Sequence, residues 1–363
     1  MASLIYKVTM SDELKKLRAS IDALDRQVLE LINRRATHAR SIGQLKNGAV
    51  YRPEREAQIL RRIKEANPGP LSDETVARLF REIMSACLAL EKPMAVSYLG
   101  PQGTFSEAAA IKHFGHAAHS IACTSIDEVM QKVEAGEVDY AVTPVENSTE
   151  GAVGRTLDLM LATPLKICGE VVLRVHQHLL RKSKGRKNIR RIYSHAQSFA
   201  QCHEWLNVNL PGVQRVNVAS NAEAARLAGK DAGSCAIAGD MAAERYGLNI
   251  LNTNIEDEPN NTTRFWILGA HDAEPSGKDK TSLVMSSKNV PGAVHQLLTP
   301  LAHYGVSMSK LESRPSRTGL WEYVFFVDIE GHQQQENVAK ALAELGEKAA
   351  FLKILGSYPA AVL

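Results

Sequence analysis

A helical pattern of apolar residues in the first part of this chain constrains its fold more than any other feature. Between Ser11 and Leu45 apolar side chains recur at alternating steps of three and four residues, which places them on one face of an α-helix. The pattern predicts one long amphipathic helix. Its apolar positions are Leu14, Leu17, Ile21, Leu24, Val28, Leu31, Ile42 and Leu45.

Two shorter helices are predicted to follow. Pro53, with acidic residues in the turn after it, is typical of a helix start, and the Asn-Pro-Gly-Pro segment at 67–70 ends that helix. Ser72 is a preferred N-cap for a third helix, which ends before Pro93. Residues 1–92 are therefore predicted to form an all-helical domain.

Cations lie along the first predicted helix. Arg35 follows Leu31 by four residues, so it falls within the apolar stripe, where a buried cation needs an anion. Lys46 comes later on the same side, about 16 Å along the helix. The two could converge on a small dianion, or form structural salt bridges. Arg18 lies about 25 Å and roughly 100° from Arg35, so it could join that pocket only from a second copy, in an intertwined antiparallel dimer.

After Pro93 short β-rich runs alternate with helical segments, which predicts an α/β domain over residues 95–271 with a mainly parallel sheet. Beyond a linker at 274–277, residues 279–357 show the order strand, helix, two strands, helix and strand. That order is typical of a ferredoxin-like α+β unit. The predicted strands of the α/β domain are Ala95–Leu99, Tyr140–Pro144, Ile167–Val175, Arg191–Ser194, Gln214–Ala219 and Cys235–Ala238.

Composition excludes several classes of protein. With 363 residues the chain can hold more than one domain, and a net charge of +3 without a basic stripe argues against a nucleic-acid partner. No apolar run reaches the roughly 18 residues of a membrane helix, and no secretory signal is present, so a cytoplasmic location is expected. The five widely spaced cysteines favour reduced thiols. No metal and no cofactor are expected.

The helical region resembles the all-helical chorismate mutase family over residues 8–92. The resemblance rests on the run LRASIDALDRQVLELINRRATHARSIGQLK and on the segments YRPEREAQIL and RLFREIMSACLALE. It implies that the two carboxylates of chorismate are bound by Arg35, by Arg55 and by Arg18 of a second copy.

The mutase reaction is a pericyclic rearrangement, so positioning and charge stabilisation are sufficient for catalysis. The resemblance implies that Lys46 hydrogen bonds to the ether oxygen, that Glu56 holds the ring hydroxyl and that Arg52 contributes through its backbone. Cys87 stands where the family often has Ser, and it either lines the site or only packs. Glu91 stands where Gln is frequent. We expect Glu91 to act protonated, because an ionised carboxylate would repel the developing oxyanion.

The α/β domain resembles prephenate dehydratase over about residues 95–270, in the segments YLGPQGTFSEAAA, DYAVTPVENSTEGAV, YSHAQSFAQC, ASNAEAA and IEDEPNNTTRFWIL. The resemblance implies two lobes similar to those of periplasmic binding proteins, with hinge crossings near Leu173 and Glu258. Prephenate must lose carbon dioxide and its hydroxyl. The cleft therefore needs hydrogen-bond donors at the leaving oxygen and an anchor for a carboxylate.

By this resemblance Thr263 is the functionally important threonine of a Thr-Arg-Phe motif, and we interpret it as a donor or relay at the departing hydroxyl. Further donors are expected from Thr104, Ser106, Asn147 and Ser148. The helix that begins near Ser106 would offer free N–H groups to a carboxylate.

Two further residues near these motifs have open roles. Arg264 either anchors the substrate or holds the hinge through a salt bridge to Glu256 or Asp257. His195 is expected to be mainly a structural hydrogen-bonding residue.

The C-terminal unit resembles the ACT domains attached to this dehydratase family, in two motifs. These are Gly292, Ala293 and Val294 at the start of its first helix, and Glu312, Ser313, Arg314 and Pro315 in a loop after its second strand. The resemblance implies feedback inhibition by L-phenylalanine bound between two ACT domains of a dimer. A dimerisation module that has lost its ligand is the alternative.

The motifs together predict a bifunctional enzyme of phenylalanine biosynthesis that acts on chorismate and prephenate. A mutase fused to prephenate dehydrogenase would need a G-x-G-x-x-G fingerprint after a strand, and the sequence has none. A binding protein that only senses a small acid is the other alternative. An assay separates the two, because only the enzyme yields phenylpyruvate from chorismate.

Overall fold

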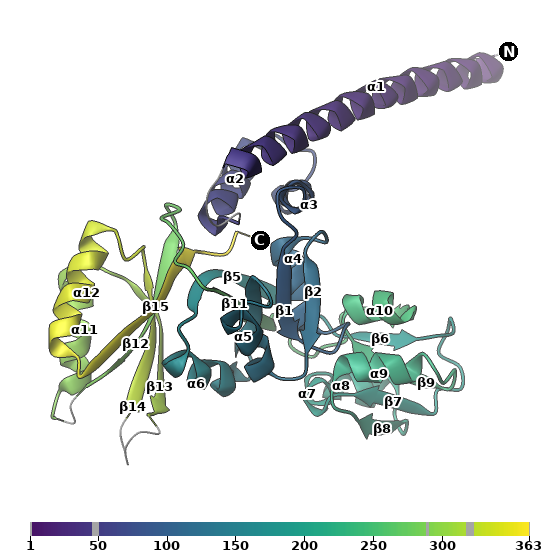
Figure 1. Ribbon diagram of the computed structural model, residues 1–363. Coiled ribbons are helices and arrows are strands. Elements are labelled where there is room, and N and C mark those ends of the chain that lie inside the picture. The colour runs from purple at the N-terminus through teal and green to yellow at the C-terminus, as the bar shows by residue number, and fades with distance from the viewer. Residues whose placement is uncertain (1, 46–50, 288–289, 317–322, 363) are drawn as a thin grey trace.

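The computed structural model describes residues 2–45, 51–287, 290–316 and 323–362. These residues form an N-terminal helical region, a two-lobed α/β region and a C-terminal α+β region (Figure 1). Within those ranges no helix has both the length and the apolar character needed to cross a membrane. All five cysteines are free and buried, which agrees with the predicted reduced thiols.

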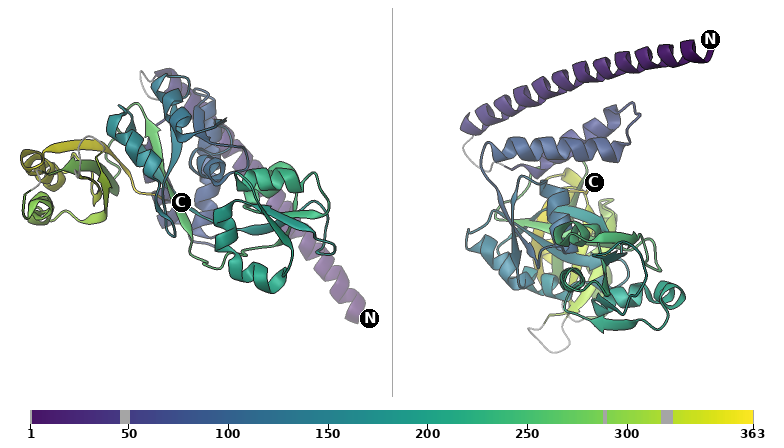
Figure 2. Two further views of the ribbon diagram at one scale, coloured as in Figure 1. Left: turned by 90° about the horizontal axis from the view of Figure 1, so that it is seen from below. Right: turned by 90° about the vertical axis from the view of Figure 1, so that its right-hand side faces the viewer.

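The N-terminal region contains the helices α1 (Ala2–Leu45), α2 (Pro53–Ala66) and α3 (Asp73–Ala89). Ser72 caps α3 by accepting a hydrogen bond from the N–H of Thr75 at 3.3 Å. α1 starts before the predicted Ser11 and rises away from the body of the molecule (Figures 1 and 2). Its apolar stripe is therefore exposed in the single chain, where Leu17 is 59% and Val28 53% exposed.

The first lobe is built on a sheet with the strand order β2-β1-β3-β11-β5, and β4 pairs with β3. α4 packs on one face of this sheet, while α5 and α6 pack on the other. The elements of this lobe are β1 (Ala95–Leu99), α4 (Phe105–Phe114), β2 (His119–Cys123), α5 (Ile126–Glu134), β3 (Tyr140–Asn147), β4 (Gly151–Ala152), α6 (Gly154–Ala162), β5 (Lys166–Arg174) and β11 (Thr262–Gly269).

The second lobe is built on a sheet with the strand order β10-β6-β9-β7-β8. The chain enters this lobe after β5 and returns to the first lobe at β11, so two segments cross between the lobes. The elements are β6 (His178–Arg181), β7 (Arg191–Ser194), α7 (Ala196–Gln201), α8 (His203–Asn209), β8 (Gln214–Asn217), α9 (Asn221–Ala228), β9 (Ser234–Ala238), α10 (Asp240–Tyr246) and β10 (Asn249–Asn252).

The structure corrects the prediction of a mainly parallel sheet, because both lobes have mixed sheets. β1 runs parallel to β2 and β3, and β7 runs parallel to β8 and β9. The strands beside the crossings run the other way: β11 is antiparallel to β3 and β5, and β6 is antiparallel to β9 and β10. The crossing segments reverse the chain direction, which a pattern of local strands and helices does not reveal.

The C-terminal region has the predicted βαββαβ order and forms one antiparallel sheet, β13-β14-β12-β15. α11 and α12 cover the face that points away from the lobes (Figure 1). The elements are β12 (Asp279–Ser286), α11 (Ala293–His303), β13 (Met308–Pro315), β14 (Tyr323–Glu330), α12 (Glu336–Lys348) and β15 (Phe351–Pro359).

The other face of this sheet shares an apolar core with the first lobe. Phe326 and Leu355 from the C-terminal sheet belong to the same buried cluster as Met160 of α6. β15 approaches β5 so closely that any side chain at Gly356 would collide with the backbone of Ile167. The first lobe and the C-terminal region are therefore packed as one body.

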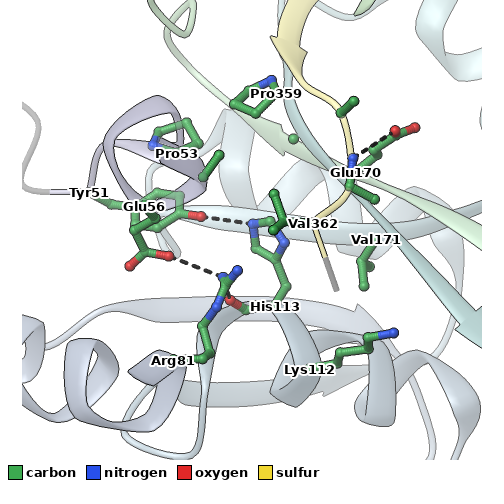
Figure 3. Close-up of a pocket in the computed structure, with 14 residues that line it drawn as sticks. Tyr51, Pro53, Glu56, Arg81, Lys112, His113, Glu170, Val171, Pro359 and Val362 are labelled. Carbon is green, nitrogen blue, oxygen red and sulfur yellow. Dashed lines mark hydrogen bonds and ion pairs between the residues drawn. The ribbon is translucent and has the colours of Figure 1, made fainter. Parts of the chain in front are cut away.

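A small junction joins the helical region to the rest of the chain (Figure 3). Here Tyr51 lies beside His113 of α4, with its hydroxyl 2.8 Å from Nε2. Burial raises the pKa of Tyr51 and lowers the pKa of His113, so a protonated phenol donates to a neutral imidazole. Arg81 of α3 pairs with Glu56 of α2 at 3.0 Å and also donates to the carbonyl of His113.

The last described residues close the same junction. Val362 packs against the helical core that contains Leu60, and its carbonyl accepts a hydrogen bond from Lys64 at 3.2 Å. Arg61 donates to the carbonyl of Ala360 at 3.2 Å. The C-terminal segment thus lies between α2 and the first lobe (Figure 3).

The Arg81 contacts predict a stability effect. Arg81→Ala removes the ion pair of the largely buried Glu56 carboxylate and the hydrogen bond to the His113 carbonyl, so the free energy of unfolding should fall by about 3–5 kcal/mol. Urea unfolding of the full chain measures the change. Arg78→Ala is the matched control, because Arg78 is exposed on the same helix and its loss should cost less than about 0.5 kcal/mol. Equal stability of the two variants would contradict the prediction.

Candidate functional site

A cleft of about 760 Å³ lies between the two lobes and is lined by residues from both. Its lining includes the first residues of three helices, α4, α7 and α9. The caps Thr104, His195 and Ser220 each accept a backbone N–H from the first turn of their helix, at 3.4, 3.4 and 3.1 Å. The remaining N–H groups and the helix dipoles favour anions. The cleft therefore suits a small acid.

Asn147 and Thr263 face each other across the strands β3 and β11, at the edge of this cleft. The Asn147 Nδ2 donates to Thr263 Oγ1 at 2.9 Å and to Asn261 Oδ1 at 2.8 Å. Its Oδ1 accepts two backbone N–H groups, at 3.0 and 3.1 Å, which fixes the orientation of the amide. Because Thr263 Oγ1 already accepts a hydrogen bond from Asn147, its own O–H is left to donate into the cleft.

The structure places four of the predicted dehydratase residues in the cleft lining, namely Thr104, Ser106, Asn147 and Thr263. Ser148 is exposed and lies outside that lining, so its role as a donor stays a prediction. Its Oγ accepts the N–H of Thr262 and its own N–H donates to the Thr262 carbonyl, both at 2.9 Å. Ser148 therefore fastens the end of the strand pair.

Arg264 is a correction. It does not line the cleft, and the predicted salt bridge to Glu256 or Asp257 is not formed. Those carboxylates accept hydrogen bonds from the hinge backbone and from the first turn of α8 instead. Arg264 pairs with Glu170 of β5 at 2.7 Å and with Asp328 of β14. It points away from the cleft because it follows Thr263 on a strand.

Three polar residues in the cleft were not predicted. Gln177 is 1% exposed and donates to Ser198 Oγ at 3.1 Å. Asn221 donates to the same Oγ at 2.7 Å and accepts the N–H of His195 at 3.1 Å. This network joins the hinge to the starts of α7 and α9. Asn221 stands in the quoted segment ASNAEAA, directly after the cap Ser220 of α9, and that position at a helix start was the available signal.

Part of the predicted mutase set also comes together. The Glu56 carboxylate lies inside the helical region near Arg81 and Arg35. Burial raises the pKa of Glu56, and the charges of Arg81 and Arg35 oppose that rise. Arg35 is partly buried. Lys46 lies outside the described residues, so its convergence with Arg35 stays a prediction.

Glu91 and Cys87 lie on or just after α3. α1 approaches closely here, since a Cβ at Gly43 would come within 2.9 Å of the Cβ of Glu91. The Glu91 Oε2 is buried and has no hydrogen-bond partner within the described ranges. Cys87 is buried, which fits both packing and lining a site.

The remaining predicted cations are exposed in the single chain. Arg55 is on the surface of α2, and Arg52 lies 3.9 Å from Glu54. Arg18 is exposed on α1. It lies about 25 Å from Arg35 along the same helix, so the two cannot share a site within one chain.

Arg81 is the helical residue that sequence reasoning missed. It follows Ala77 by four residues and precedes Met84 by three, so it lies in the buried stripe of α3. A cation in an apolar stripe needs an anion. Arg81 therefore carries the same sequence signal as Arg35.

The predicted regulatory residues lie on different elements from those expected. Gly292 precedes α11 with φ 76°, a left-handed conformation that favours glycine, and Ala293 and Val294 open that helix. Glu312, Ser313, Arg314 and Pro315 were expected in a loop, but they form the end of the edge strand β13. They pair there with residues 323–326, and Arg314 contacts Asp158 of α6 at 2.9 Å. Packing on the first lobe keeps this segment extended.

Comparison with known proteins gives three family matches. A model for prephenate dehydratase matches residues 96–273, one for type II chorismate mutase matches 17–92, and one for the ACT domain matches 281–347.

Similar proteins match almost the whole chain. The bifunctional chorismate mutase/prephenate dehydratase of Neisseria gonorrhoeae is 57% identical over 359 residues, which is 98% of this chain and 99% of that protein. The protein of that name from Pseudomonas aeruginosa is 52% identical over 361 residues, 97% of this chain and 99% of its own length. The prephenate dehydratase of Arthrobacter aurescens, solved in complex with L-Phe, is 36% identical with a TM-score of 0.67, covering 73% of this chain and 89% of that one.

Proposed function

The chain belongs to the family of bifunctional chorismate mutase/prephenate dehydratases, and we propose that its two reactions take place at separate sites in one chain. It is a chorismate mutase, which is an isomerase, and a prephenate dehydratase, which is a carbon-oxygen lyase, with an ACT domain. We assign the mutase to residues 1–92, the dehydratase to 95–271 and the ACT domain to 279–357. The hinge of the dehydratase lies near Leu173 and Glu258.

The dehydratase site is proposed to be the cleft, and the Asn147–Thr263 pair supports this assignment most directly. Prephenate is a dianion, and the start of α4 offers N–H groups at Ser106 for its side-chain carboxylate. The Thr263 hydroxyl, oriented by Asn147, donates a hydrogen bond to the ring hydroxyl and relays to it a proton taken from solvent, so that the group leaves as water. Loss of carbon dioxide supplies the electron pair that makes the ring aromatic. No cofactor is required for this step.

The mutase site is proposed to lie on the helices around Arg35. Its ligand set is Arg35, Arg55, Lys46, Glu56, Arg52, Cys87 and Glu91, with Arg18 from a second copy. The guanidinium groups bind the carboxylates of chorismate and hold its compact conformer. Cationic and hydrogen-bonding groups stabilise the charge that grows on the ether oxygen.

Assembly is proposed to be at least a dimer, intertwined through α1. The exposed apolar stripe of α1 supports this, because an apolar face of this length needs a cover and the described part of the chain supplies none. A second α1 of the same sequence, packed antiparallel, would cover it. The same arrangement would carry Arg18 to the site of the other chain.

The ACT domain is proposed to bind L-phenylalanine and to inhibit the dehydratase. The solved relative from Arthrobacter aurescens was crystallised with L-Phe. The predicted ligand residues lie at the start of α11 and on the edge strand β13, whose open edge is available to a second ACT domain.

The five free cysteines support the further proposal of a cytoplasmic location.

The two sites can be separated by assay. Purified protein supplied with chorismate alone should release phenylpyruvate. Arg35→Ala should lower the mutase kcat/KM about a hundredfold and leave the rate from prephenate unchanged, because a carboxylate partner is lost. Thr263→Ala should lower the rate from prephenate about a hundredfold and spare the mutase. Loss of both activities in either variant would contradict separate sites.

The position of Glu91 predicts the effect of a neutral hydrogen-bond donor. Glu91→Gln keeps a donor and removes the carboxylate that would repel the ether oxygen, so the mutase kcat/KM of the variant should equal or exceed that of the wild type. The dehydratase rate of the variant serves as the control. A mutase kcat/KM that falls about tenfold in Glu91→Gln would exclude this role.

The intertwined dimer predicts complementation. Arg18→Ala and Arg35→Ala should each be inactive as a mutase. In a mixed dimer, one of the two sites contains both an intact Arg18 and an intact Arg35. Co-expression of the two variants should restore about a quarter of the wild-type mutase rate. Each variant expressed alone is the control. No recovery in isolated mixed dimers would contradict the proposed site shared between two chains.

A further inference from the structure

Two neighbouring rungs of the strand pair β3 and β11 face different parts of the molecule. The first rung is Asn147 with Thr263, and the second is Glu146 with Arg264. Successive side chains on a strand point to opposite faces. The first rung lines the cleft, and the second contacts the ACT domain. One residue step therefore separates the reactive hydroxyl from the regulatory domain.

Each residue of the second rung is held by an opposite charge from the ACT domain. Arg264 pairs with Asp328 on β14, and Glu146 pairs with Lys310 on β13 at 2.8 Å. The Arg264 side chain is 12% exposed and that of Asp328 is 4% exposed. Water screens such buried charges weakly, so the attraction is strong at this distance. The ACT sheet thus fixes where the rung lies.

The contacts of Arg264 fix its orientation too. Its guanidinium donates to Glu170 at 2.7 Å, to the Tyr358 hydroxyl at 2.8 Å, and to Asp328. Ser282 joins Asp328 to Tyr358, with distances of 2.5 and 2.6 Å. A planar group held by three partners cannot turn without breaking a buried hydrogen bond.

A β-bulge lies next to these rungs. The register between β11 and β3 shifts between Arg264 and Phe265, and Val145 of β3 has no opposite residue on β11. Bulges bend a strand and re-aim its side chains. The direction of the Asn147 and Thr263 side chains therefore depends on the position of the neighbouring pair, Glu146 and Arg264.

We propose that Asp328 and Lys310 are positioning residues for the dehydration of prephenate. By clamping the rung of Glu146 and Arg264, they keep Asn147 and Thr263 aimed into the cleft. The proposal rests on the function proposed above for Thr263. It makes the ACT domain part of the dehydratase machinery, and movement of the ACT sheet changes the dehydratase rate through this clamp.

The test compares variants of the full chain with prephenate as substrate. Asp328→Asn and Lys310→Met should each lower kcat about tenfold with KM changed less than about twofold, because the aim of a transition-state donor is lost. The mutase rate should not change. Lys353→Met is the matched control, since Lys353 also joins the ACT domain to the first lobe, through three carbonyls of α6 and its C-terminal end, away from the rungs. It should keep both rates.

A double variant separates positioning from general weakening. If Asp328 acts through Thr263, adding Asp328→Asn to Thr263→Ala should cause no further loss of kcat. A further tenfold loss in that background would overturn the proposal. The proposal would also be overturned if Asp328→Asn and Lys310→Met had wild-type rates while Thr263→Ala had a lowered rate. That outcome would leave the function proposed for Thr263 intact. A wild-type rate of Thr263→Ala would instead overturn the proposed function. Lys310→Met, whose partner Glu146 is partly exposed, decides the test if Asp328→Asn does not fold.

Discussion

Buried and partly buried guanidinium groups connect the three domains of this enzyme. Arg81 joins the helical domain to α4, Arg264 joins the first lobe to the ACT sheet, and Arg61 ties α2 to the C-terminal segment. Removing such a charge from water is costly, so each contact is stable only when its partners are in place. A guanidinium also demands planar, directed acceptors. Burial of the apolar cores supplies most of the stabilising free energy, and these arginines determine the relative orientation of the domains.

The two sites use the fold in different ways because their reactions differ. The mutase needs only a rigid set of cations around a compact substrate, and in the proposed dimer helices from two chains supply it. The dehydratase must bind a dianion, release carbon dioxide and help a hydroxyl to leave. The cleft proposed for this reaction brings together helix starts from both lobes and the strand pair of Asn147 and Thr263. Because Thr263 lies on a strand, and not on a loop, its hydroxyl has a fixed position at the edge of the cleft.

Sequence periodicity predicted the three N-terminal helices, the order of helices and strands along the ACT domain, and the separate regions, since each depends on local pattern. It failed where residues distant in sequence meet. The antiparallel course of β11 and the partners of Arg264 depend on a return across the hinge and on a second domain. Ser148 stands in a motif with Asn147, yet only the register shows that it points away from the cleft. The burial of Arg81 could have been predicted from the sequence, because Arg81 lies in an apolar stripe as Arg35 does.

The C-terminal segment has a consequence for how the chain matures. The helical domain leaves the ribosome first, but Val362 packs on its core and Lys64 binds the Val362 carbonyl. These contacts form only after the ACT domain has been synthesised. The helical domain therefore makes these contacts only after the lobes and the ACT domain have been synthesised, and the order of synthesis differs from the order in which the domains are completed.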